Sequence, residues 1–274
     1  MEEPLTILYT ANLRGDLERL PRLHTFLRQL KNQRPADEPD VMLCAVEPVA
    51  RRILLLDAGN ACALDTWHCA ATGGRSALIV LDAMGYQAAN VAGFLTAEGR
   101  ARLDANYLGI ALVDEAHPWQ SGDVVVACGT GLPTEAESHP SEDNGSRFQT
   151  TDDLNDQATS PIHGAYTPSS RGISSPGGSL RIVLPPSASD ALVGAKRASP
   201  APENPPDLRP SPVGEIYLPP VEALQVGVIH VAWANHVPVI QARTVLDMPP
   251  NTPPDPTITS AVEFVLAEAR RLGR

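Results

Sequence analysis

The sequence is poor in aromatic residues and contains no long apolar run. Only 4% of its 274 residues are Phe, Trp or Tyr. No stretch approaches the roughly 18 apolar residues that a membrane-spanning helix needs, so no membrane partner is expected. Positive charge is also scarce, because 21 Lys and Arg face 32 Asp and Glu and give a formal net charge of −11. Such a surface repels phosphate backbones, so nucleic acid is not an expected partner.

Cysteine is sparse and shows none of the spacings typical of metal sites. The four cysteines are Cys44, Cys62, Cys69 and Cys128, with no CxxC pair. The acidic start of the chain does not resemble a secretory signal, which predicts a cytoplasmic protein with reduced cysteines. They are then expected to be buried small apolar residues. A metal cluster of Cys62, His68 and Cys69 is disfavoured, because adjacent side chains rarely point at one ion.

Proline is abundant, with 27 residues, and it is unevenly distributed. From about residue 130 to 212 the chain is rich in Ser, Pro, Thr, Gly, Asp, Glu and Asn. Such a segment buries too little apolar surface to offset its backbone entropy. We therefore predict a long, mostly disordered Pro/Ser-rich insert at 131–212, with a possible strand at 180–184. Residues 1–130 and 213–274 are then the two parts of one domain.

Outside this insert the pattern alternates between strands and helices. Apolar runs predict strands at 5–10, 53–57 and 88–92, separated by a Leu-rich helix after residue 17 and a second helix at 75–84. This order predicts an α/β fold with a parallel sheet and right-handed crossovers. Further strands are expected at 109–113, 123–128, 213–218, 226–231 and 237–246, and a closing helix at 255–272. A short strand is also considered at 41–46, within the loop at 36–50.

Each of the first three expected strands ends in a short loop. The carboxyl ends of parallel strands meet at one edge of a sheet, so these loops are expected to lie together. The loops are Thr10-Ala11-Asn12-Leu13-Arg14-Gly15, Asp57-Ala58-Gly59-Asn60 and Asn90-Val91-Ala92-Gly93-Phe94-Leu95.

In order and spacing these loops resemble those of the calcineurin-like metallophosphoesterases, specifically the catalytic domain of the 5′-nucleotidase group. That family carries T-N-D-x-H-G in the first loop, D-A-G-D in the second and G-N-H-E in the third. The resemblance covers residues 4 to about 112 and, more weakly, 213 to 270. It implies a metallophosphoesterase-like α/β sandwich, with four layers but reduced in size, and a site at the strand ends that holds two divalent metals in the family.

The ligand positions of the family carry other residue types in this chain. Asn12 and Arg14 stand in place of the first-loop Asp and His, and Asn60 in place of the bridging Asp. The third-loop Asn and His correspond to Gly93 and Phe94. Amides and a guanidinium do not replace the anionic and imidazole ligands of a dimetal centre. The resemblance thus implies no metal, no cofactor and no catalytic residue, only a vestigial pocket of Asn12, Arg14, Asn60 and Phe94.

Simpler roles for these residues stay open at this point. Asn12 and Asn60 could satisfy backbone groups at the strand ends, as Asn does in turns. Arg14 could be solvated, or it could pair with Asp16 or Asp57. Alternatively, Arg14 and the two asparagines retain a pocket for a weakly bound phosphate or nucleotide, because arginine binds phosphate in a two-pronged geometry.

The sequence therefore favours a degenerate, non-catalytic 5′-nucleotidase-like protein that acts as a binding or scaffolding module. One alternative is an active phosphoesterase that hydrolyses nucleotides or related phosphate esters. A second alternative is an interaction protein that works through its disordered insert.

Overall fold

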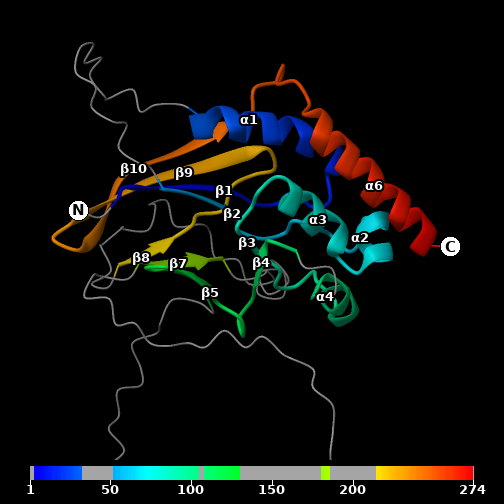
Figure 1. The fold of residues 1–274 in the computed structure, drawn as a ribbon, viewed down its shortest axis with the longest axis horizontal. Coiled ribbons are helices and arrows are strands. Elements are labelled where there is room, and N and C mark those ends of the chain that lie inside the picture. Colours follow the sequence, from blue (N-terminus) through cyan, green and yellow to red (C-terminus); the bar gives the residue numbers. More distant parts are fainter. Residues whose placement is uncertain (1–2, 33–51, 105–107, 130–179, 186–213, 274) are drawn as a thin grey trace, which may run out of the picture. The chain divides into compact units, whose positions relative to one another are not determined.

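The computed structural model describes residues 3–32, 52–104, 108–129, 180–185 and 214–273. These residues form two mixed β-sheets and a group of helices (Figure 1). The predicted α/β class is confirmed. Most of the predicted insert at 131–212 and the short strand considered near residues 41–46 lie outside the described residues.

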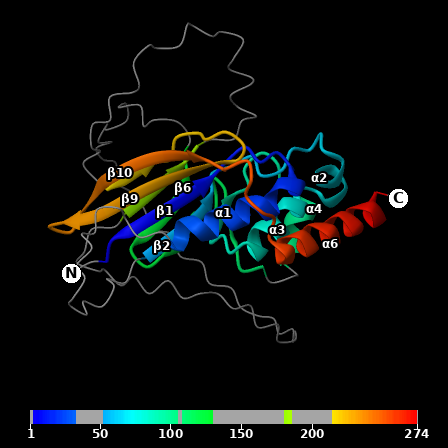
Figure 2. The same ribbon diagram turned by 90° about the horizontal axis from the view of Figure 1, so that it is seen from above.

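The first sheet has six strands in the order β10-β9-β1-β2-β3-β4. Strands β1 to β4 are parallel to one another, whereas β9 runs antiparallel to both β1 and β10. Figure 2 shows β10, β9, β1 and β2 side by side in this order. The bounds are β1 Leu5–Thr10, β2 Arg52–Asp57, β3 Ala88–Asn90, β4 Ala111–Val113, β9 Gln225–Ala234 and β10 Val237–Asp247.

The second sheet has four strands in the order β5-β6-β7-β8, of which β6, β7 and β8 are parallel. Its strand β7 coincides with the possible strand predicted at 180–184, and it pairs along its whole length with β6. The bounds are β5 Trp119–Ser121, β6 Val124–Cys128, β7 Leu180–Leu184 and β8 Glu215–Tyr217.

Helices pack on one face of the six-stranded sheet and the second sheet packs on the other. Side chains of β1 alternate between these two faces: Leu8 joins the core under the helices, while Ile7 and Tyr9 join the core shared with the second sheet. Both faces of the central strands are therefore buried, which explains their continuous apolar runs. Of the four layers that the resemblance implied, the described residues supply three.

The helices follow the predicted periodicity where it is strong. Helix α1 buries Leu20, Leu23 and Leu27 at spacings of three and four, and α6 buries a similar stripe. Helix α6 starts with Pro256 and is capped by Asp255, whose Oδ1 accepts the Thr257 N–H at 2.9 Å. The bounds are α1 Leu20–Asn32, α2 Trp67–Thr72, α3 Arg75–Ala83, α4 Ala97–Asp104 and α6 Pro256–Leu272. None of the helices in the described ranges is long and apolar enough to cross a membrane.

Candidate functional site

The loops after β1 and β2 are joined along their backbones just beyond the sheet. The Asn12 N–H donates to the carbonyl of Gly59 at 2.9 Å, and the Arg14 N–H donates to the carbonyl of Asn60 at 2.7 Å. Pairing of the two strands thus continues into the loops. Residues 12–15 and 59–61 form one hydrogen-bonded backbone frame, which carries the side chains of Asn12, Arg14 and Asn60.

Three residues of this frame have left-handed backbone conformations. The φ angle is 55° at Asn12, 51° at Arg14 and 58° at Asn60. Asparagine tolerates this region, whereas arginine has no short side chain to compensate for the steric cost. Such residues persist where the surrounding structure holds them, which is often at functional sites. The frame therefore fixes Arg14 in a conformation that arginine does not favour by itself.

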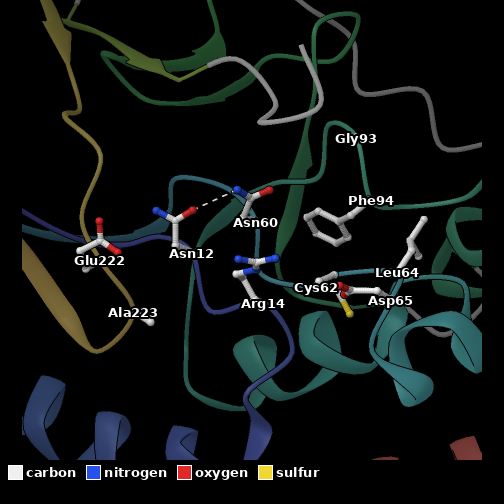
Figure 3. A pocket seen from close by; sticks show the side chains of 11 residues that line it. Asn12, Arg14, Asn60, Cys62, Leu64, Asp65, Gly93, Phe94, Glu222 and Ala223 are labelled. Carbon is white, nitrogen blue, oxygen red and sulfur yellow. Dashed lines mark hydrogen bonds between the residues drawn. The ribbon is translucent and has the colours of Figure 1, made fainter. Parts of the chain in front are cut away.

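The frame opens into a pocket of ≈ 820 Å³. Asn12, Arg14, Asn60 and Phe94, the four residues expected to form a pocket, all line it (Figure 3). Figure 3 shows Arg14 between the two asparagines and Phe94. The ring of Phe94 is buried, at 4% exposure, and gives one end of the pocket an apolar wall.

The two asparagines form a short chain of hydrogen bonds. The Asn60 amide donates to Oδ1 of Asn12 at 3.0 Å, and the Asn12 amide donates to the carbonyl of Val221 at 2.8 Å. Asn12 thus satisfies a backbone group, although that group belongs to the segment before β9 and not to its own strand end. This chain ties the loops after β1 and β2 to the segment before β9.

Arg14 is exposed, and its guanidinium points into the pocket (Figure 3). Neither of the ion pairs considered from the sequence is formed. Asp16 pairs with Arg19 at 3.1 Å instead, and Asp57 is fully buried away from the pocket. Across the described ranges, no carboxylate pairs with Arg14. Its charge is therefore available to a ligand.

The donor set of this pocket does not fit a dinuclear metal centre. Its carboxylates, Asp65 and Glu222, lie at opposite ends, with Arg14 and the asparagines between them (Figure 3). A guanidinium at the centre repels a divalent ion. In the part of the chain that the structure describes, no group of three or more His, Cys, Asp or Glu residues is arranged to hold a metal.

A buried polar cluster lies beneath the frame at the end of β2. Asp57 is completely buried, and burial raises the pKa of its carboxyl to about 8, although the Gly59 N–H and the Thr10 hydroxyl act in the opposite direction. The Thr10 hydroxyl also lies 2.9 Å from the hydroxyl of Tyr86. Among the described residues, Oδ1 of Asp57 has no hydrogen-bond partner. The folded protein therefore favours the protonated form of Asp57 at neutral pH.

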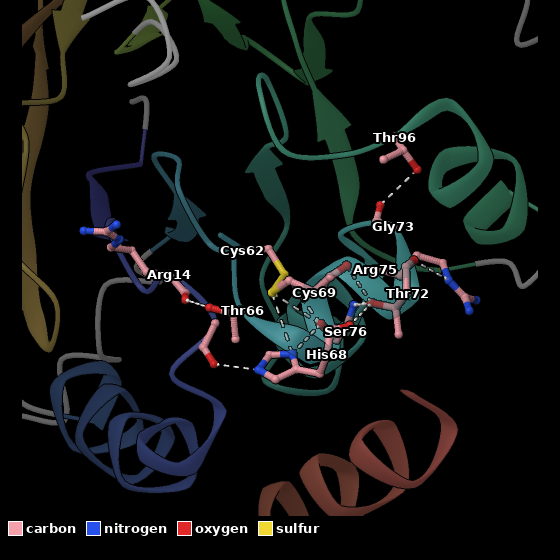
Figure 4. Close-up of a disulfide and its surroundings, with 11 residues drawn as sticks. Arg14, Cys62, Thr66, His68, Cys69, Thr72, Gly73, Arg75, Ser76 and Thr96 are labelled. Carbon is pink, nitrogen blue, oxygen red and sulfur yellow. Dashed lines mark hydrogen bonds between the residues drawn. A yellow bond between two sulfur atoms is a disulfide. The ribbon is translucent and has the colours of Figure 1, made fainter. Parts of the chain in front are cut away.

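Two cysteines beside the pocket form a disulfide, contrary to the prediction that all cysteines are reduced. Cys62 and Cys69 are bonded, and both are buried (Figure 4). The start of helix α2 brings their Cα atoms to 5.9 Å, which is within the range that a disulfide spans. A spacing of seven residues is not a known disulfide or metal motif, so this bond could not be predicted from the cysteine spacing. Cys128 is a free cysteine, and Cys44 lies outside the described residues.

The fold formed by these two sheets and the helices resembles that of a calcineurin-like phosphoesterase. Among solved structures, the chain is similar to the calcineurin-like phosphoesterase YfkN from Bacillus subtilis, with a TM-score of 0.50 and 10% sequence identity over 100% of each chain. No protein-family model matches the sequence, and no curated protein matches it. At this identity the similarity establishes the fold alone.

Several pocket residues were not found by sequence reasoning. Glu222 and Ala223 reach the pocket from the segment before β9, more than 200 residues after Arg14. Leu64 and Asp65 come from the loop between β2 and α2. These flanking segments lie outside the three strand-end loops and carry no motif of their own that points to the pocket.

Proposed function

We propose that this protein is a non-catalytic binding or scaffolding module with a calcineurin-like phosphoesterase fold, derived from a 5′-nucleotidase-like ancestor. The observation that carries this proposal is the placement of Asn12, Arg14, Asn60 and Phe94 in one pocket. Their positions correspond to those of the metal ligands and the catalytic histidine in the family. A cation and neutral groups thus stand where hydrolysis requires metals and a general acid.

The ligand proposed for this pocket is a small molecule with one anionic group. Arg14 supplies a fixed charge and a planar donor pair that suits a phosphate or carboxylate. Asp65 and Glu222 flank this single guanidinium, so ligands with several negative charges are disfavoured. A nucleotide with one phosphate group is compatible with this pattern, and Phe94 offers an apolar surface for its base.

The protein is expected to bind neither manganese nor zinc stoichiometrically, and to leave aryl phosphate esters intact when either metal is supplied. The reason is the donor set, in which Asn12, Arg14 and Asn60 replace charged ligands. Elemental analysis of purified protein and an assay with p-nitrophenyl phosphate check this expectation. About two metal ions per chain, removed by a chelator together with hydrolytic activity, would instead establish the alternative of an active phosphoesterase.

Phosphate or AMP is expected to bind with a Kd near 1 mM, and Arg14→Ala is expected to abolish this binding. A Kd of 1 mM corresponds to about 4 kcal/mol, of which one charged hydrogen-bonded pair contributes about 1.5–3 kcal/mol and the other pocket contacts the rest. A micromolar complex would need roughly 8 kcal/mol. At 10 mM ligand such a site stabilises the fold by about 1.4 kcal/mol, or a Tm increase of about 4 °C. Thermal unfolding with and without ligand measures this shift.

Arg19→Ala is a matched control for this experiment, because Arg19 lies near Arg14 but pairs with Asp16 and does not line the pocket. That variant should retain the full thermal shift. If several millimolar phosphate or AMP leaves the Tm of the unmodified protein unchanged, the pocket does not bind these anions and only the scaffolding proposal stands.

The remaining proposals concern the insert and the cellular location. An interaction function of the insert at 131–212 is the second alternative, and it depends on residues outside the described ranges. A cytoplasmic location stays a prediction, and the Cys62–Cys69 disulfide counts against it, because disulfides persist mainly in oxidising compartments.

A further inference from the structure

The short segment from Cys62 to Cys69 packs directly against the backbone that carries Arg14. The hydroxyl of Thr66 donates to the carbonyl of Arg14 at 3.2 Å. The ring of His68 donates from Nε2 to the carbonyl of Gly15 at 2.9 Å. Both carbonyls of this turn are therefore bound by one segment, whose ends are joined by the disulfide.

The fit between the turn and the disulfide is close. Gly15 has a φ of 82°, and a Cβ atom at this position would lie 3.0 Å from Sγ of Cys69 and 3.2 Å from Cε1 of His68. Only glycine adopts this positive φ without strain and also leaves room for the sulfur atom and the histidine ring. The backbone next to Arg14 thus rests on the disulfide and on the histidine ring.

His68 is itself held in one orientation. It is buried, and burial lowers the pKa of its imidazole, which keeps the ring neutral. Because Nε2 donates to Gly15, Nδ1 accepts the hydroxyl proton of Ser76 at 2.9 Å. The hydroxyl oxygen of Ser76 also lies 3.5 Å from Sγ of Cys62. Sγ of Cys69 lies 3.7 Å from the same oxygen, so a contiguous buried network connects both sulfur atoms to the turn.

We propose that the Cys62–Cys69 disulfide is a redox-controlled brace that positions Arg14 for ligand binding. This inference rests on the proposed function of the pocket. With the disulfide formed, the segment holds the Arg14 and Gly15 carbonyls and keeps Arg14 in its left-handed conformation. With the disulfide reduced, the segment is released, and Arg14 returns to the backbone conformations that arginine prefers.

The chemistry of the switch is ordinary thiol–disulfide exchange with a dithiol reductant. One thiolate of the reductant attacks one protein sulfur, forms a mixed disulfide with it and releases the other protein sulfur as a thiolate. The second thiolate of the reductant then attacks the reductant sulfur of the mixed disulfide and releases the first protein sulfur. The protein gains two S–H groups, and the reductant becomes a cyclic disulfide. Cys62 lines the pocket, so attack comes from the pocket side. A bound ligand should therefore slow the reduction.

The first test measures the order of the turn without any ligand. Hydrogen exchange is followed at the amides of Arg14 and Gly15, which donate to the carbonyls of Asn60 and Ala61. Reduction with dithiothreitol, or the double substitution Cys62→Ala with Cys69→Ala, should increase exchange at these amides at least about tenfold. Exchange in β1 and α6 should not change. Equal exchange of the turn in oxidised and reduced protein would overturn the proposal.

The second test measures binding of inorganic phosphate. If reduction lowers the population of the competent Arg14 conformation to about one fifth, the apparent Kd rises about fivefold. Thr66→Val should weaken binding in the same direction while leaving the disulfide intact. Cys128→Ala is the matched control, because Cys128 is free and does not line the pocket. The Kd of this variant for phosphate should still rise when dithiothreitol is added.

These two tests separate failure of the brace from failure of the binding site. If the oxidised protein does not bind phosphate but its turn loosens on reduction, the brace stands and the proposed ligand is wrong. If phosphate binds equally well to oxidised and reduced protein, the brace is wrong and the binding function stands. Mass spectrometry after alkylation verifies the disulfide, and free thiols at Cys62 and Cys69 in protein purified without reductant would also overturn the proposal.

Discussion

At pH 8 the variant Asp57→Asn is expected to be several kcal/mol more stable than the unmodified protein, whereas near pH 4 the two should be equally stable. Burial raises the pKa of Asp57 from 3.8 to about 8 in the folded state. Between these values the folded protein binds a proton that the unfolded chain has released. The contribution of Asp57 to the free energy of unfolding is therefore fully present below pH 4 and is lost as the pH rises towards 8.

The slope of this loss is about 1.4 kcal/mol per pH unit, so the total approaches roughly 5 kcal/mol. Asparagine has almost the same shape as protonated aspartic acid and does not ionise, so it removes the loss. Denaturant unfolding of both proteins from pH 4 to pH 8 measures the difference. A difference that does not change with pH would mean that Asp57 is not the titrating group.

Asp114→Asn is the control of opposite sign. Burial acts to raise the pKa of Asp114, but hydrogen bonds from His117 and from the Ala116 N–H, together with the charge of Arg100, lower it overall. The ionised form therefore stabilises the folded state, and the benefit is lost as the pH falls through the lowered value. This variant should be less stable than the unmodified protein at neutral pH, and the deficit should shrink in acid.

Gly227→Ala is expected to destabilise the fold by about 3 kcal/mol or more, at the upper end of the cost of overpacking a core. Gly227 pairs with Tyr9 across β9 and β1. An added Cβ would overlap Cε1 and Cζ of the Tyr9 ring, which is completely buried. The ring cannot move aside without disturbing the core between the sheets. A Tm decrease of about 9 °C is the expected result.

A double-mutant cycle tests the cause of this effect. In the double variant Gly227→Ala with Tyr9→Leu, the ring that causes the clash is absent. The destabilisation of the double variant should therefore be clearly smaller than the sum of the destabilisations of the two single variants. Gly109→Ala serves as the control, because its added Cβ would lie 3.2 Å from a side-chain oxygen of Asp82, which is free to shift. Strict additivity of the first pair would contradict the clash with Tyr9.

The parts of the fold that the sequence predicted well have strong local patterns. Continuous apolar runs predicted β1 and β2, because both faces of these strands are covered. Leucine spacing predicted α1, and the Asp255-Pro256 start predicted α6. The helices α2 and α4 were not predicted, since α2 is only six residues long and α4 has hardly any apolar face. Such elements are fixed by their surroundings and not by local pattern.

The candidate site was predictable only in its strand-end loops. Asn12, Arg14, Asn60 and Phe94 follow strands whose order is evident from the sequence, and parallel pairing brings them together. The contribution of Glu222 depends on where the segment before β9 lies, which no local signal reveals. The disulfide was missed for a different reason, because pairing of Cys62 with Cys69 depends on the turn before α2.

The position of β1 in its sheet has a consequence for synthesis of the chain on the ribosome. Leu5 pairs with Arg52 on one side and with Val231 on the other, so its two partners are 47 and 226 residues further along the chain. At about 5–20 residues per second, β1 waits on the order of ten seconds or more for β9 to be translated. During that interval an apolar strand edge in the middle of the future sheet is open to other nascent chains. The N-terminal half therefore carries an exposed strand edge throughout this part of translation, and a ribosome stalled before residue 225 leaves that edge uncovered.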